Sequence, residues 1–151
     1  MDQQLQPPSG LIDGSRHYYP VRVFFEDTDL SGIAYHANYL KWCERARSDI
    51  LRLLGIDQRA AHAAGEGYYA VAEANLKYRR PALFEDVLTV VTQATDIRAA
   101  SARMHQQVRR GEEVLADVHI LAAFVSADGR PQRQPAAWRE AFATFAAKDP
   151  E

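Results

Sequence analysis

Hydrophobic and polar residues alternate with a helical period in one segment of this chain and with a period of two in most of the rest. Over residues 39–54 the apolar residues recur at helical spacing and charged residues occupy the opposite face. Asn38 is placed to cap the start of this helix, and Gly55 is placed to end it. The wide, aromatic apolar face predicts that this helix is the central element of the core. Its members are Tyr39, Trp42, Cys43, Ala46, Ile50, Leu53 and Leu54.

Shorter elements flank this helix, and long strands follow it. A short strand is expected over residues 21–25, and a short second helix fits within residues 56–65. Pro135 suits the first turn of a last helix. Four long strands are expected as a meander in chain order, over residues 68–79, 87–97, 102–109 and 114–124.

This order of elements predicts an α+β fold, in which the long helix covers one face of a curved antiparallel sheet. The 151 residues suit one domain that buries roughly 68–70% of its unfolded surface. Residues 1–17 are polar and contain proline and glycine, so we expect a flexible tail there. A single domain is expected over residues 18–147.

Composition and charge exclude several classes of protein. Hydrophobic residues make up 47% and charged residues 25%, which excludes a disordered chain. The net charge of −2 provides no general attraction for nucleic acid, so any phosphate site must be built locally. The sequence has no apolar run long enough for a membrane span and no signal-peptide pattern at its start. We therefore expect a cytoplasmic protein without membrane insertion.

Motifs for nucleophilic, nucleotide and metal chemistry are absent or incomplete. The chain has no Gly-x-Ser-x-Gly elbow, and its one cysteine, Cys43, lies on the apolar face of the helix, which favours a buried inert thiol. Residues 65–70 match the dinucleotide fingerprint by letter, but a strand follows where that site requires a helix. The five histidines lack metal-ligand spacing. We expect no metal and no cofactor.

One segment remains as a candidate site. Residues 26–39 (EDTDLSGIAYHANY) place acids before a glycine-containing loop that leads into the long helix. In a structural interpretation, Asp27 and Asp29 bond backbone amides and stabilise the turn. In a functional interpretation, the free amides at the helix start polarise a carbonyl group, and a carboxylate beside them attacks it or deprotonates water. The spacing alone leaves both open.

The segment, together with residues 44–47 (ERAR), resembles the 4-hydroxybenzoyl-CoA thioesterase family of hot-dog-fold proteins. It resembles in particular the acyl-CoA thioesterases encoded with the Tol–Pal envelope system of Gram-negative bacteria. The resemblance covers about residues 20 to 140, and it is looser through Tyr78, Pro81 and Asp86. It implies a hot-dog fold, in which a curved antiparallel sheet wraps a long helix.

The resemblance also implies roles for individual residues. Asp29 falls on the catalytic carboxylate, which acts as nucleophile or general base on the thioester carbonyl. His36 falls where a backbone amide polarises that carbonyl, and a histidine there is implicated in catalysis in the Tol–Pal branch. Gly32 and Tyr35, in the same motif, are expected to contact the substrate. Relatives commonly have tyrosine where this chain has Phe25, a difference that bears on activity or acyl preference.

Coenzyme A carries phosphates, so a substrate of this kind requires local basic residues. Arg130 and Arg133, just after the last strand, are expected to bind it, because relatives bring basic residues towards the nucleotide there. Residues 77–80 form a second basic cluster, and each cluster also fits an ordinary solvated surface. The family's active site lies between two subunits, so a homodimer or homotetramer is expected, and long strands with open edges agree with this.

The expected function is therefore an acyl-CoA thioesterase, a hydrolase that releases a free acid and coenzyme A. The alternative is a hot-dog protein that binds acyl-CoA as a sensor or scaffold without hydrolysing it. Hydration or dehydration of an enoyl thioester ranks last, because it requires an Asp/His pair in a local pattern that this sequence lacks.

Overall fold

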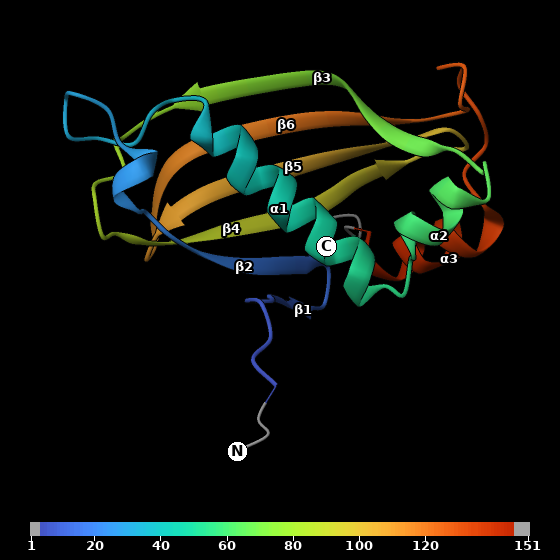
Figure 1. Ribbon diagram of the computed structural model, residues 1–151, viewed down its shortest axis with the longest axis horizontal. Helices are drawn as coiled ribbons and strands as arrows, with labels where there is room; N and C mark the ends of the chain where they lie inside the picture. The colour runs from blue at the N-terminus through green and yellow to red at the C-terminus, as the bar shows by residue number, and fades with distance from the viewer. Residues whose placement is uncertain (1–3, 147–151) are drawn as a thin grey trace, which may run out of the picture.

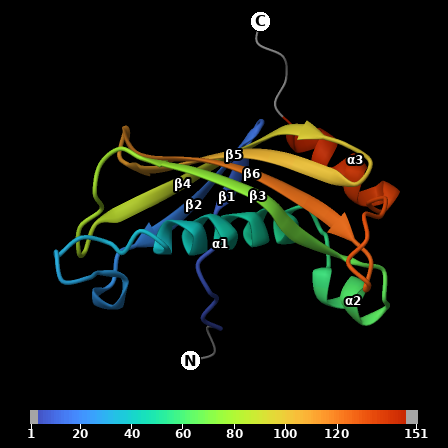
Figure 2. The same ribbon diagram turned by 90° about the horizontal axis from the view of Figure 1, so that it is seen from above.

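A six-stranded antiparallel sheet curves around the long helix α1 in the computed structural model, which describes residues 4–146 (Figures 1 and 2). The predicted α+β class, with the helix covering one face of the sheet, is confirmed. No helix within the described residues is long and apolar enough to cross a membrane. The elements are β1 (Leu11–Asp13), β2 (Arg16–Arg22), a 3₁₀ turn (Phe25–Asp27), α1 (Asn38–Leu53), α2 (Gln58–Ala63), β3 (Tyr68–Tyr78), β4 (Val87–Ile97), β5 (Ser101–Arg110), β6 (Glu113–Val125) and α3 (Ala136–Phe145).

Helix α1 is the core element that its apolar face predicts. Trp42, Cys43 and Ile50 are fully or almost fully buried against the concave face of the sheet. Gly55 has a φ of 78°, and its amide donates to the Arg52 carbonyl at 3.1 Å, so it ends the helix as predicted.

The predicted cap at the start of α1 is wrong. The cap position is occupied by Ala37, which provides no side-chain hydrogen bond. Asn38 instead turns its side-chain amide towards the preceding loop, where Nδ2 donates to the Asp27 carbonyl at 2.7 Å. A pattern of residue types does not reveal this, because the loop competes with the helix for the same side chain.

The order of the strands differs from the predicted meander. The sheet runs β1-β2-β4-β5-β6-β3, so β3 lies at one edge and pairs only with β6 (Figure 1). Both edges of β4 are occupied by β2 and β5, which leaves no place for β3 beside it. Alternation predicts each strand correctly, but it carries no information about which strands are neighbours.

The sheet also begins earlier than the expected tail allows. Strand β1 and the start of β2 lie within residues 1–17, and β2 ends at Arg22 rather than covering residues 21–25. His17 is fully buried, and its Nε2 lies 2.7 Å from Oδ2 of Asp49 on α1. This long-range pair fixes a segment whose composition is typical of a tail. Residues 1–3 of that tail, and residue 147 at the expected end of the domain, lie outside the described residues.

Candidate active site

The loop between the 3₁₀ turn and α1 folds back on itself as a small hairpin. Thr28 and Ala34 form an isolated antiparallel bridge, and the amide of Asp29 donates to the Ile33 carbonyl at 3.0 Å. The amide of Gly32 closes the tip by donating to the Asp29 carbonyl at 3.0 Å, with a φ of 81° that favours glycine. Backbone hydrogen bonds therefore place the side chain of Asp29 at the base of a tight turn.

The carboxylate of Asp29 is bound through one oxygen only. Oδ1 accepts a hydrogen bond from the Ser31 amide at 2.8 Å and another from the Ser31 hydroxyl. No residue in the described part of the chain donates to Oδ2, and the side chain is exposed. The hydrogen bonds from Ser31, hydroxyl first, together with the charge of His36, lower the pKa of Asp29 below its ordinary value. Asp29 is thus an ionised carboxylate with one free oxygen at neutral pH.

The start of α1 leaves amides free beside this loop. Neither the His36 amide nor the Ala37 amide donates to any residue within 4–146. The His36 carbonyl accepts a hydrogen bond from the Tyr78 hydroxyl at 2.8 Å, and the exposed His36 ring lies 4.4 Å from the Tyr35 ring between centroids. Free amides at the positive end of a helix stabilise negative charge on a carbonyl oxygen.

Asp27 and Phe25 have surroundings different from those of Asp29. Asp27 is structural, as the first interpretation expects, because its Oδ2 accepts from the Phe24 amide at 2.8 Å. Its carbonyl also accepts from the Tyr35 amide at 2.7 Å. The Phe25 side chain is 79% exposed, and its ring packs edge to face on Phe84 at 6.2 Å. Asp27 and Asp29 therefore both accept a backbone amide, as the structural interpretation expects, and the functional interpretation of Asp29 stays a prediction.

The basic cluster after β6 lies far from this loop. Arg130 and Arg133 are exposed in the segment after β6, which lies at the α2 end of the molecule in Figure 1. Tyr78, which bonds His36, and Tyr68, which pairs with the end of β6, are at opposite ends of β3. At about 3.3 Å per residue, these ends are roughly 33 Å apart. Within one chain the two arginines are therefore remote from Asp29.

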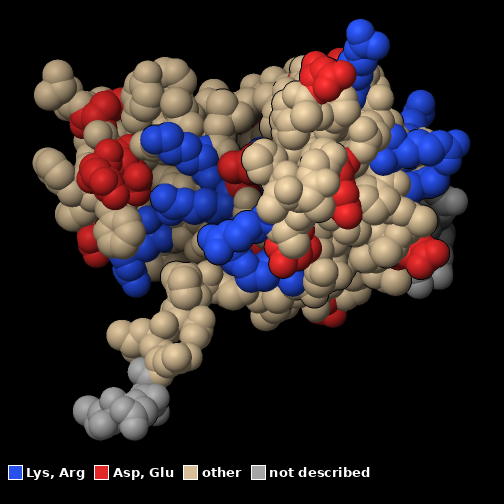
Figure 3. Space-filling view, turned by 45° about the vertical axis from the view of Figure 1, so that its right-hand side comes forward, with Lys and Arg blue, Asp and Glu red and all other residues tan. Residues whose placement is uncertain are grey.

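The second basic cluster is largely engaged in ion pairs. Arg79 pairs with Asp117 at 2.7 Å, and Arg80 pairs with Glu113 at 3.2 Å. Acidic and basic side chains are both exposed at the left in Figure 3, the end of the molecule that carries the Asp29 loop. The second basic cluster lies at the Tyr78 end of β3, the end that contacts the start of α1, but its arginines are paired with acids of β6.

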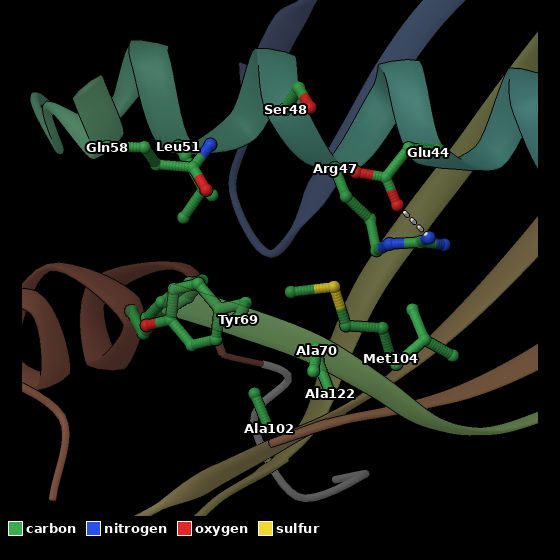
Figure 4. Close-up of a pocket in the computed structure, with 12 residues that line it drawn as sticks. Glu44, Arg47, Ser48, Leu51, Gln58, Tyr69, Ala70, Ala102, Met104 and Ala122 are labelled. Carbon is green, nitrogen blue, oxygen red and sulfur yellow. Dashed lines mark hydrogen bonds and ion pairs between the residues drawn. The ribbon is translucent and has the colours of Figure 1, made fainter. Parts of the chain in front are cut away.

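A separate small cavity of about 70 Å³ lies between α1 and the sheet (Figure 4). Arg47 and Glu44 form an ion pair at its rim, and Arg47 Nη1 also donates to Gln106 Oε1 at 2.8 Å. None of the predicted site residues lines it. The nearby Cys43 thiol is buried, which raises its pKa to about 12, so the prediction of an inert thiol is confirmed. The lining residues are Glu44, Arg47, Ser48, Leu51, Gln58, Tyr69, Ala70, Val71, Ala102, Met104, Ala122 and Phe142.

Two of the contacts that this loop makes were not predicted from the sequence. The first is the pair of hydrogen bonds from Ser31 to Asp29, for which a hydroxyl residue two positions after an aspartate is a local signal. The second is the hydrogen bond from Tyr78, which has no local signal because 42 positions separate it from His36.

Comparison with known proteins assigns this arrangement to a family. The sequence pattern of the Thioesterase-like superfamily matches residues 23–145. The chain belongs to the Thioesterase-like superfamily. The predicted relationship is thereby confirmed, and so is the prediction of a thioester hydrolase.

Individual members of the superfamily are similar over most of this chain. The acyl-CoA thioesterase YbgC of Haemophilus influenzae is 33% identical over 107 residues, which is 71% of this chain and 79% of that protein. The acyl-CoA thioester hydrolase YbgC of Escherichia coli O6:H1 is 36% identical over 97 residues, 64% of this chain and 72% of that protein.

Solved structures show the same architecture. A probable thioesterase from Bartonella henselae has a TM-score of 0.76 and 32% identity, covering 80% of this chain and 99% of that one. A 1,4-dihydroxy-2-naphthoyl-CoA thioesterase from Synechocystis has a TM-score of 0.79 at 20% identity, covering 85% of this chain and 96% of that one. The predicted hot-dog fold is confirmed.

Proposed function

We propose that this member of the superfamily hydrolyses acyl-CoA thioesters to a free acid and coenzyme A, with Asp29 as the catalytic carboxylate. The observation that carries this proposal is the free Oδ2 oxygen of an ionised Asp29, in the loop that leads into the free amides at the start of α1. The YbgC proteins that resemble this chain are named for the same activity.

The chemistry requires only these groups. The thioester carbonyl oxygen accepts hydrogen bonds from the free amides of His36 and Ala37, which stabilise the oxyanion that forms. Oδ2 of Asp29 either attacks the carbonyl carbon, giving a mixed anhydride that water then hydrolyses, or takes a proton from the attacking water. In both routes the C–S bond breaks and coenzyme A leaves as a thiolate. Thiolates are good leaving groups, so no triad is needed.

The substrate's phosphates are bound, in this proposal, by a second copy of the chain. The outer edge of β3 pairs with no strand among residues 4–146. The unpaired backbone groups of such a long edge can form hydrogen bonds with a strand of a second chain. Antiparallel pairing of two β3 edges about a twofold axis sets the Tyr68 end of one copy beside the Tyr78 end of the other. Arg130 and Arg133 of one copy then approach Asp29 of the other. The minimum active unit is a homodimer.

Asp29→Asn tests the catalytic role. Asparagine retains an oxygen that accepts both hydrogen bonds from Ser31, so the loop is expected to keep its fold while the charge is lost. The rate of thiol release from acyl-CoA is expected to fall by about 10²–10⁴, the usual contribution of a positioned base or nucleophile. Asp27→Asn is the matched control, since it removes a structural acid two positions away and is expected to keep most activity.

Two results oppose the proposal. Undiminished turnover by Asp29→Asn excludes this residue as the catalytic carboxylate. Saturable binding of acyl-CoA by the unmodified protein without thiol release favours the alternative, a sensor or scaffold.

Mixing two inactive variants tests the shared site. Chains with Asp29→Asn and chains with Arg130→Ala and Arg133→Ala are unfolded and refolded together, and acyl-CoA hydrolysis is measured at low substrate concentration. If each site takes Asp29 and the arginines from different copies, half of the dimers are mixed and each has one intact site, which restores about a quarter of the normal activity. No recovery on mixing places both groups in one chain, and full activity of the arginine variant alone removes them from substrate binding.

A further inference from the structure

We propose that Ser31 is a positioning residue for hydrolysis, because its amide and hydroxyl bind one oxygen of Asp29 and leave the other oxygen directed at the substrate. This inference rests on the proposed function of Asp29. It assigns a role to Ser31, for which neither the sequence motif nor the family resemblance provides one.

The contacts of Asp29 single out Ser31. Both hydrogen bonds to the carboxylate come from Ser31 and end on Oδ1: the amide donates at 2.8 Å, and the hydroxyl donates as well. No other residue in the described part of the chain donates to either oxygen. An exposed aspartate otherwise rotates among several side-chain conformations, and only Ser31 restrains this rotation.

The contacts of Ser31 itself also support a role in positioning Asp29. Its hydroxyl bonds only Asp29 within residues 4–146, and its side chain is exposed and is not part of the hydrophobic core. Removing the hydroxyl therefore leaves the core and the backbone hydrogen bonds of the loop in place. The loop is closed independently by the amides of Asp29 and Gly32.

Orientation matters here because the two oxygens of a carboxylate are equivalent until one is bound. Two donors on Oδ1 make Oδ2 the oxygen that is free to attack or to accept a proton. A group restrained in its reactive orientation gains rate without gaining affinity for the substrate. The effect of Ser31 is therefore expected in kcat and not in KM.

The test uses Ser31→Ala, with Ser31→Thr as the variant that restores the hydroxyl. For acyl-CoA hydrolysis, kcat of Ser31→Ala is expected to fall by about 2- to 10-fold, the value of one net hydrogen bond, with KM unchanged. Ser31→Thr is expected to retain most of kcat. The Asp29 carboxyl, followed by NMR, is expected to titrate at a higher pH in Ser31→Ala, because a hydrogen bond to the charged form is lost.

A double-variant cycle separates this role from a general effect on the loop. In the Asp29→Asn background, Ser31→Ala is expected to cause no further loss of the residual rate, because Ser31 acts through the carboxylate. An unchanged kcat in Ser31→Ala, or an equal loss in both backgrounds, overturns the inference while leaving the function of Asp29 intact. Full activity of Asp29→Asn overturns the function itself.

Discussion

The Tyr78 hydroxyl, at the end of β3, donates a hydrogen bond to the His36 carbonyl, at the start of α1, over 2.8 Å. The Tyr78 ring also packs edge to face on the buried Tyr39 ring at 5.2 Å. A peptide unit is planar, and its carbonyl and amide point in opposite directions. By binding the His36 carbonyl, Tyr78 therefore also orients the amide of Ala37, one of the two free amides in the proposed site.

Removing this hydroxyl is expected to reduce catalysis without unfolding the protein. In Tyr78→Phe the ring contacts remain but the peptide between His36 and Ala37 is free to tilt. We expect kcat for acyl-CoA hydrolysis to fall by about 2- to 10-fold, as for the loss of one net hydrogen bond. Tyr18→Phe is the control, because the Tyr18 hydroxyl bonds no residue in the described chain. Equal rates for the two variants contradict the role of Tyr78.

The fold was predictable wherever the pattern is local. Helical spacing of apolar residues locates α1, and alternation locates β3 to β6 within a few residues. The edge position of β3 was not predictable, because it depends on which strands already occupy both sides of β4. The sequence also did not predict that β1 and His17 are part of the folded domain, because this depends on Asp49, which is 32 positions away from His17.

The candidate site likewise has a part that the sequence predicts and a part that depends on contacts between distant residues. Asp29, Gly32 and His36 lie within eight consecutive residues, so one loop motif identifies them together. The role of Tyr78 comes from tertiary structure and leaves no local pattern. Proximity of Arg130 and Arg133 to Asp29 requires a second chain, and a single sequence does not specify such contacts. Their role in substrate binding stays a prediction.

Arg47 is expected to contribute to stability through a buried polar network. Its guanidinium donates to Gln106 Oε1 at 2.8 Å, and Gln106 Nε2 donates to the Thr92 hydroxyl at 2.9 Å. Arg47→Met leaves Gln106 Oε1 buried without a donor, which should lower the free energy of unfolding by about 1–3 kcal/mol. Urea denaturation measures this. The exposed Arg45 on the same helix gives the control Arg45→Met, which is expected to change stability by less than about 0.5 kcal/mol.

The buried pair of His17 and Asp49 predicts that stability depends on pH. Burial lowers the pKa of His17, although its hydrogen bond to Asp49 and the charge of Asp49 oppose this. His17 Nδ1 is buried without a partner, so a second proton on the ring would have no acceptor. There is therefore a pH range in which this histidine is protonated in the unfolded state but His17 is neutral in the folded state.

The sign of the effect follows from this difference in bound protons. Stability rises with pH wherever the unfolded state binds more protons, so the free energy of unfolding should fall as pH drops below about 6.5. The loss should reach about 1.4 kcal/mol for each unit by which folding lowers the pKa of His17. Urea denaturation at pH 7.5 and pH 5.0 measures it.

His17→Gln isolates the contribution of this histidine. Glutamine has an amide that can donate to Asp49 and does not titrate, so the loss of stability between the two pH values should be smaller in this variant. His62→Gln, which replaces an exposed histidine of α2, should keep the loss seen in the unmodified protein. An identical loss in His17→Gln and the unmodified protein would exclude His17 as the titrating group. In that case the carboxylates bound in the folded state, Asp49 among them, would have to account for the whole dependence.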